Sequence, residues 1–101
     1  MPADARGLAD LDRLIHEPAR LALTAILNVV DSADFLYLQR ETGLTKGNLS
    51  SHLAKLEEAG YVAIEKTYRG RIPLTLVHLT DKGAAAYKAY RARFKEFLSR
   101  A

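Results

Sequence analysis

Apolar residues repeat at helical spacing over residues 45–59 and give the predicted helix two unlike faces. Its apolar stripe consists of Leu49, Leu53 and Leu56, at i, i+4 and i+7. Thr45 is expected to cap the helix, because its hydroxyl can accept an N–H group of the first turn. The outer face is small, uncharged or basic over three turns and carries acids only at its C-terminal end. Such an acid-free leading end is what a helix needs to lie in a DNA groove.

Helical spacing predicts two helices near the N-terminus. The first is short and amphipathic and ends near His16; its apolar positions are Leu8, Leu11, Leu14 and Ile15. Pro18 suits the first position of the second helix, where its missing N–H is not needed. This helix covers residues 18–30 and has little polar face, so we expect it to be the most buried one.

A third helix is predicted to begin at Phe35, with Asp34 as its N-cap. Gly43 can take the left-handed conformation that ends a helix. Phe35 and Leu38 are expected to face inward, with Leu36 as a further candidate. The third helix and the helix over 45–59 are therefore joined by a tight turn.

After that pair of helices the apolar period changes from 3.6 to 2, which predicts a β-hairpin over 61–79. One half-buried strand begins at Tyr61, and a second covers residues 74–79. Pro73 stands at the entry of the second strand, where a missing donor is tolerated. A turn at 68–71, which contains a glycine between two arginines, gives the hairpin a basic tip.

The last predicted helix covers residues 81–100 and carries an aromatic heptad seam. Its positions step by 4, 3, 4, 3 and 4, at Gly83, Tyr87, Tyr90, Phe94, Phe97 and Ala101. The helix can pack on its own domain, or on a second subunit together with the N-terminal helix. We favour the second arrangement, because an exposed aromatic stripe would be a large apolar patch on a monomer. The predicted dimer interface comprises Leu8, Leu11, Tyr87, Tyr90, Phe94 and Phe97.

Length and composition are those of one globular domain over residues 1–101. The hydrophobic content of 49% and the charged content of 27% are ordinary for such a domain. No apolar run approaches about 18 residues and no signal-peptide pattern is present, so we expect a soluble, cytoplasmic protein without a membrane partner. The absence of cysteine excludes disulfides and thiolate metal sites, and we expect neither a metal nor a cofactor.

The net charge of +3 is unevenly distributed along the chain. Residues 1–43 carry four basic and seven acidic side chains, a balance of −3. Residues 44–71 have five basic and three acidic side chains (+2), and residues 81–101 have six and two (+4). The positive charge therefore lies in the C-terminal two-thirds of the chain, where it could meet a phosphate backbone.

Three blocks of the chain carry a family resemblance, namely LDRLIHEPARLALTAIL, DFLYLQRETGLTKGNLSSHLAKLEEAGYVAIEK and VHLTDKG. They resemble the small winged helix-turn-helix transcriptional regulators related to the MarR and ArsR families, over about residues 11–90. The most specific parts are LTKGNLSSHLAKLEEAGYV and the LTDKG that follows the hairpin. The implied fold is mainly α with a β-hairpin wing, and its N- and C-terminal helices form the dimer interface.

The resemblance implies a homodimer that binds double-stranded DNA at an inverted repeat. Each subunit would place the recognition helix (45–59) in a major groove and the wing (61–79) on the adjacent minor groove or backbone. The positions that meet DNA in such regulators are here Thr45, Lys46, Gly47, Asn48, Ser50, Ser51 and Lys55. Arg69 and Arg71 at the wing tip suit the negative potential of a narrow minor groove.

Side-chain chemistry agrees with most of these positions. Asn48 can make two hydrogen bonds to adenine, and Lys46 and Lys55 suit phosphates or guanine. Ser51 departs from the family pattern, since relatives often hold a long basic or amide residue there. A serine reaches less far toward the bases, so we expect backbone contacts, the wing and dimer spacing to supply much of the specificity.

Catalytic and metal-binding chemistry find no support in the sequence. We interpret His52 as a boundary residue that packs on the core and bonds to backbone or phosphate. No pair of histidines has the i, i+4 spacing of metal ligands on one helix. Glycine-rich phosphate loops, nucleophile elbows and HExxH motifs are absent from the sequence, so we predict no enzymatic activity.

The sequence thus favours a sequence-specific transcriptional regulator that acts as a homodimer and represses by occluding a promoter. Two alternatives stay open: a winged helix used as a protein-interaction module, and a sequence-indifferent architectural DNA-binding protein. Acids at the positions of Ser51 or Lys55 would have favoured the interaction module, and they are not present. A cleft between dimer helices could admit a small apolar effector, which nothing in the sequence specifies.

Overall fold

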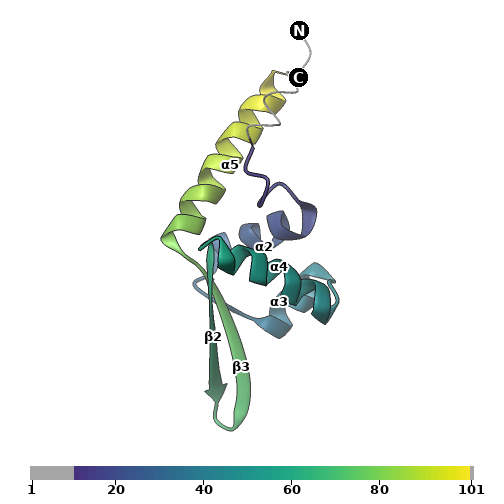
Figure 1. Cartoon of the computed structure of the whole chain (residues 1–101), viewed down its shortest axis with the longest axis vertical. Helices are drawn as coiled ribbons and strands as arrows, with labels where there is room; N and C mark the ends of the chain where they lie inside the picture. The colour runs from purple at the N-terminus through teal and green to yellow at the C-terminus, as the bar shows by residue number, and fades with distance from the viewer. Residues whose placement is uncertain (1–10, 101) are drawn as a thin grey trace.

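A computed structural model describes residues 11–100 (Figure 1). Its elements, in chain order, are α2 (Pro18–Val29), β1 (Ala33–Asp34), α3 (Phe35–Thr42), α4 (Lys46–Glu58), β2 (Val62–Arg69), β3 (Ile72–Leu79) and α5 (Asp81–Ser99). The molecule is elongated, with extents of 59 × 26 × 21 Å. The β2–β3 hairpin projects from one end of the helical body and α5 from the other (Figure 1).

The tight turn between α3 and α4 forms as the sequence predicts. Asp34 caps α3, because its carboxylate accepts a hydrogen bond from the Tyr37 N–H at 2.8 Å. Gly43 ends α3 in the left-handed region, with φ at 70°. The Thr45 hydroxyl then accepts the Asn48 N–H at 3.1 Å and starts α4. These caps are local interactions, and together they set the angle at which α4 leaves the helical body.

The three strands form one antiparallel sheet in the order β1-β3-β2. The hairpin register runs from the pair Val62↔Leu79 to the pair Arg69↔Ile72. Its turn is therefore only two residues, and glycine is favoured at the first of them because φ is positive there (65°). The predicted turn at 68–71 was too long, since its first two residues continue β2. The sequence also did not predict β1, a two-residue strand that pairs with the middle of β3.

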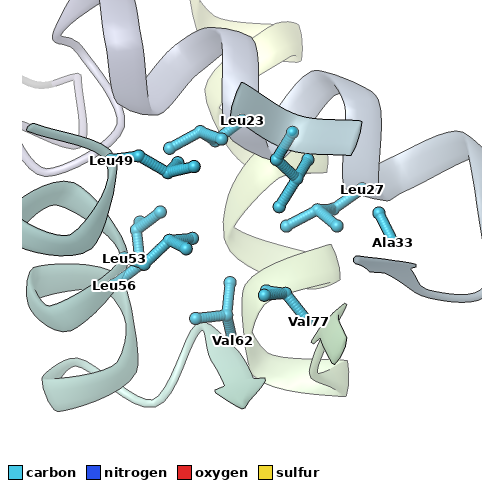
Figure 2. Packing of buried hydrophobic residues seen from close by; sticks show 9 residues of the cluster. Leu23, Leu27, Ala33, Leu49, Leu53, Leu56, Val62 and Val77 are labelled. Atoms are coloured by element: carbon cyan, nitrogen blue, oxygen red, sulfur yellow. The ribbon is translucent and has the colours of Figure 1, made fainter. Parts of the chain in front are cut away.

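The main core lies between α2, α4 and the inner ends of the hairpin (Figure 2). The predicted apolar stripe of α4 is confirmed, because Leu49, Leu53 and Leu56 are all buried. In Figure 2 these leucines point toward side chains from α2 and the strands. Burial at about 25 cal/mol per Å² of apolar surface is the main force that holds α4 in place. The inward orientation considered for Leu36 is wrong, since its side chain is 73% exposed.

The predicted N-terminal helix is not present in its described part. Residues 11–17 form turns. The Asp12 carboxylate accepts the N–H groups of Leu14 (2.9 Å) and Ile15 (3.3 Å), so the side chain takes donors that a continuing helix would use. Leu11 and Ile15 are nevertheless buried, as their spacing suggested. Leu8 lies outside the described residues.

Helix α5 packs on this N-terminal segment through the first half of its aromatic seam. Tyr87 (9% exposed) and Tyr90 (3%) are buried in a cluster with Leu11 and Ile15. The expectation that the seam is exposed on a monomer is therefore wrong at these two tyrosines, because the subunit's own N-terminal segment covers them. Farther along, Phe94 is only half-buried.

Candidate nucleic-acid interface

The predicted DNA-contacting residues of α4 share one property: every one of them is exposed. They are Thr45, Lys46, Gly47, Asn48, Ser50, Ser51 and Lys55. At about 100° per residue they divide into three lines along the helix. Gly47 and Ser51 lie opposite the buried stripe, with Lys46 and Ser50 on one flank and Asn48 and Lys55 on the other.

One flank of α4 faces the wing across a hollow. The hollow is lined by residues from β1, α3, α4 and the hairpin, namely Asp34, Phe35, Leu36, Gln39, Lys46, Ser50, Leu53, Ala54, Glu57, Ile64, Lys66, Pro73, Leu74 and Thr75. Lys46 and Ser50 of α4 therefore face the same space as Lys66 and Thr75 of the wing. This arrangement gives α4 and the wing a common surface, and lysines lie on both sides of it.

The wing tip brings charge and apolar surface together. Arg69 and Arg71 are exposed, as the sequence analysis expected. Two large apolar residues beside them are also exposed, Tyr68 at 70% and Ile72 at 66%. The sequence did not predict Tyr68 as a contact residue, because the turn predicted at 68–71 included it. The alternation of β2, continued by two residues, would have found it.

The opposite flank of α4 is tied to α2 through His52. Its Nδ1 lies 3.0 Å from the Arg20 guanidinium and 3.4 Å from the Glu17 carboxylate. Arg20 also donates from Nε to the Leu14 carbonyl at 2.6 Å. His52 thus bonds to an arginine, whereas the sequence analysis expected backbone or phosphate as its partner. The contact fixes α4 against the N-terminal end of α2.

Glu17 completes this network as the N-cap of α2. Its two carboxylate oxygens accept the N–H groups of Ala19 (2.9 Å) and Arg20 (3.0 Å). Burial acts to raise the pKa of Glu17, but these two hydrogen bonds, with the charges of His52 and Arg20, hold it below its ordinary value. The carboxylate is therefore stabilised in its charged form, where it balances Arg20.

Among residues 11–100, no group of three or more histidine, cysteine, aspartate or glutamate side chains is placed to hold a metal ion. Within that range, too, the helices are too short or too polar to cross a membrane.

Comparison with known proteins places the chain in a family. The winged helix DNA-binding domain family matches residues 19–98. An uncharacterized protein of Methanocaldococcus jannaschii is 37% identical over 79 residues, which cover 77% of this chain and 85% of the relative. An uncharacterized helix-turn-helix-type transcriptional regulator of Bacillus subtilis is 34% identical over 84 residues, and this chain spans about half (54%) of its length.

Solved structures agree with this match. A transcriptional regulator homologue of Pyrococcus horikoshii superposes with a TM-score of 0.87 at 30% identity, over 93% of this chain and 95% of the other. A MarR-family regulator of Enterococcus faecalis superposes at 0.73 and 24% identity, over 86% and 80% of the two chains, and shows the same fold. ArsR and PadR family regulators are also structural neighbours. This chain therefore belongs to the winged helix DNA-binding domain family, and it is a transcriptional regulator, rather than an enzyme, whose fold is like that of MarR and ArsR family regulators.

Proposed function

We propose that the chain binds specific DNA sequences as a homodimer and represses transcription by occluding a promoter. The observation that carries the proposal is the exposed, acid-free leading half of α4 beside an arginine-tipped wing. A phosphate backbone is attracted to the lysines of α4 and the arginines of the wing, whereas acids at those positions would repel it. In two-fold symmetry such a surface selects an inverted repeat with half-sites about one helical turn apart.

On one half-site, α4 enters the major groove with its N-terminal end first. Asn48 has the donor and acceptor needed to bond adenine at two atoms, which discriminates by about 1–3 kcal/mol against a wrong base. Lys46 and Lys55 lie on opposite flanks and suit the phosphates on the two sides of the groove. Gly47 and Ser51, on the side of α4 opposite the buried stripe, are small. They allow the helix backbone to approach the bases closely, but they can contact few bases themselves.

The dimer is the part of the proposal that the subunit structure revises. Because Leu11, Tyr87 and Tyr90 are buried within the subunit, the surface left for a partner lies farther along α5. A groove over α2 and α5 includes this part of the helix. Tyr87 and Tyr90 also line the groove, and its other large apolar residues are Leu21, Phe94 and Leu98, of which Leu98 is 55% exposed. A second copy of α5 in this groove would cover these apolar side chains. The predicted interface residues Phe94 and Phe97 stay in the proposal, and Leu98 joins them.

Selection from random duplexes, followed by binding measurements, tests DNA recognition. We expect an enriched inverted repeat, and an affinity that falls with salt by a logarithmic slope of about 0.9 per phosphate contact. Lys55→Glu and Arg69→Glu should each weaken binding, whereas Arg13→Glu, the same charge change on the exposed N-terminal segment, should not. Enrichment of no sequence would refute specific recognition, and retention by neither DNA nor a heparin column would favour a protein-interaction module.

Light scattering tests the dimer separately. Leu98→Glu should yield monomers at micromolar concentration, because it places a charge among the apolar side chains that the second copy of α5 would cover. Ala89→Glu is a matched control, since this residue is exposed on α5 but does not line the groove. A wild-type chain that is already monomeric under these conditions would refute the interface.

A further inference from the structure

The register of the hairpin divides the wing into two faces. Directly opposite residues on paired strands share a face, and successive residues alternate. Val62, Ile64, Lys66 and Tyr68 therefore lie on one face with their partners Leu79, Val77, Thr75 and Pro73. At the base of the hairpin this face is the inner one, because Val62 and Val77 are buried in the core. We call the outer part of it, Lys66, Tyr68, Pro73 and Thr75, the front row.

The front row is continuous with the surface of α4. Three of its members, Lys66, Pro73 and Thr75, line the hollow that Lys46 and Ser50 line from the other side. Tyr68 is the pair partner of Pro73, so it extends the same row one step toward the tip. Its side chain is 70% exposed. A large aromatic ring thus stands free on the side of the wing that adjoins the recognition helix.

The reverse face has a different character. Arg69 lies there with its partner Ile72, and Glu65 lies on the same face four residues earlier. The strand residues of the front row include a lysine and no acid. Among the strand residues, the front row therefore has an uncompensated lysine, whereas Glu65 offsets the charge of Arg69 on the reverse face. The large exposed side chain of the front row is that of Tyr68.

We propose that Tyr68 is a DNA-contacting residue of the wing, and that its ring packs on the sugar and base edges of the minor groove next to the major groove that α4 occupies. The inference rests on the proposed DNA binding and names a residue that carries it. Apolar side chains of minor-groove binders make such contacts, and tyrosine is rigid enough to make them at small entropic cost. The charges of Lys66 and Arg71 would steer the backbone toward the ring.

Binding measurements on the selected duplex test the contact. Tyr68→Thr, which keeps a strand-forming residue at the position, should weaken affinity roughly tenfold, as truncation of a buried interface tyrosine commonly does. Ile72→Thr, the matched change on the reverse face, should alter affinity by no more than about twofold. The salt slope should not change in Tyr68→Thr, because an apolar contact releases no counterions, while Lys66→Thr should reduce it by about 0.9.

Fluorescence supplies a second readout, because the chain contains no tryptophan. In Tyr68→Trp the single indole should shift its emission on binding of the duplex, and in Ile72→Trp it should shift less. Equal affinities of Tyr68→Thr and Ile72→Thr, or equal emission changes of the two tryptophan variants, would overturn the inference. If the wild-type chain selects and binds a sequence in the same assays, that failure belongs to Tyr68 alone. If the wild-type chain binds no duplex, the proposed function itself fails.

Discussion

His52 of the recognition helix accepts a hydrogen bond from the Arg20 guanidinium of α2 at 3.0 Å. A guanidinium carries donors and no acceptor, so the Nδ1 atom of His52 must offer its lone pair. The helix that is proposed to enter DNA is thus held to α2 by a hydrogen bond that uses the Nδ1 lone pair of His52.

Loss of the Arg20 side chain should destabilise the fold. Arg20→Met removes the donors to His52 and to the half-buried carbonyl of Leu14, at a cost of about 1–3 kcal/mol in the free energy of unfolding. Urea denaturation measures this change. Arg13→Met, a matched change at an exposed residue, should stay within about 0.5 kcal/mol of wild type. Equal stability of the two variants would show that the network contributes nothing.

The carboxylate of Glu17 should make stability depend on acid pH. Because the pKa of Glu17 in the folded chain lies below its ordinary value of 4.5, the charged carboxylate stabilises the folded state more than the neutral form does. Its contribution is therefore present above that value and is lost as pH falls through the lowered pKa. Unfolding free energies of wild type and Glu17→Gln, measured by denaturant at several pH values, should differ most near neutrality and converge in acid. Parallel curves would contradict this assignment.

Tyr61 should act at the alkaline end of the pH range. The hydrogen bond that its hydroxyl donates to Asp12, together with burial and the charge of Asp12, raises the pKa of Tyr61 to about 12. The neutral phenol is the form that the fold favours, so its contribution is complete below the ordinary value of 10.0 and is lost as pH rises toward 12. Tyr61→Phe should cost about 1 kcal/mol at neutral pH. It should also remove the highest of the tyrosine titrations followed by phenolate absorbance; an unchanged set of titrations would refute the shift.

Elements with local causes were predictable from the sequence. Asp34, Gly43 and Thr45 mark helix ends through their own side chains or φ values, so the turn between α3 and α4 could be placed to within a residue. The exposed face of α4 was predictable as well, because burial of Leu49, Leu53 and Leu56 turns the opposite side of the helix toward solvent. The helix predicted over residues 11–16 was wrong for an equally local reason. The helical spacing of apolar residues does not reveal that the Asp12 carboxylate accepts the N–H groups of Leu14 and Ile15.

Structural features that depend on contacts between residues far apart in the sequence could not be predicted from local patterns. Strand β1 is two residues long and exists because Ala33 meets Val77 across the fold. The heptad seam of α5 predicts that Tyr87 and Tyr90 are buried. It does not predict that Leu11 and Ile15 are the residues that bury them. The side of the wing on which Tyr68 stands follows from its pairing with Pro73, which required the true length of the turn.

Two glycines in helices should respond in opposite ways to alanine. A Cβ atom at Gly83, in the first turn of α5, would lie 2.0 Å from the Tyr61 carbonyl oxygen, so backbone must move to admit it. Gly83→Ala should therefore destabilise the chain by about 1–3 kcal/mol or more, and loosen the junction between the wing and α5. At Gly47 nothing lies within 4 Å of an added Cβ, and φ is not positive. Gly47→Ala should stabilise α4 by about 0.5–1 kcal/mol, because alanine loses less backbone entropy in a helix. Thermal and urea unfolding of the two variants measure both changes, and a destabilised Gly47→Ala or an unaffected Gly83→Ala would contradict the packing around these helices.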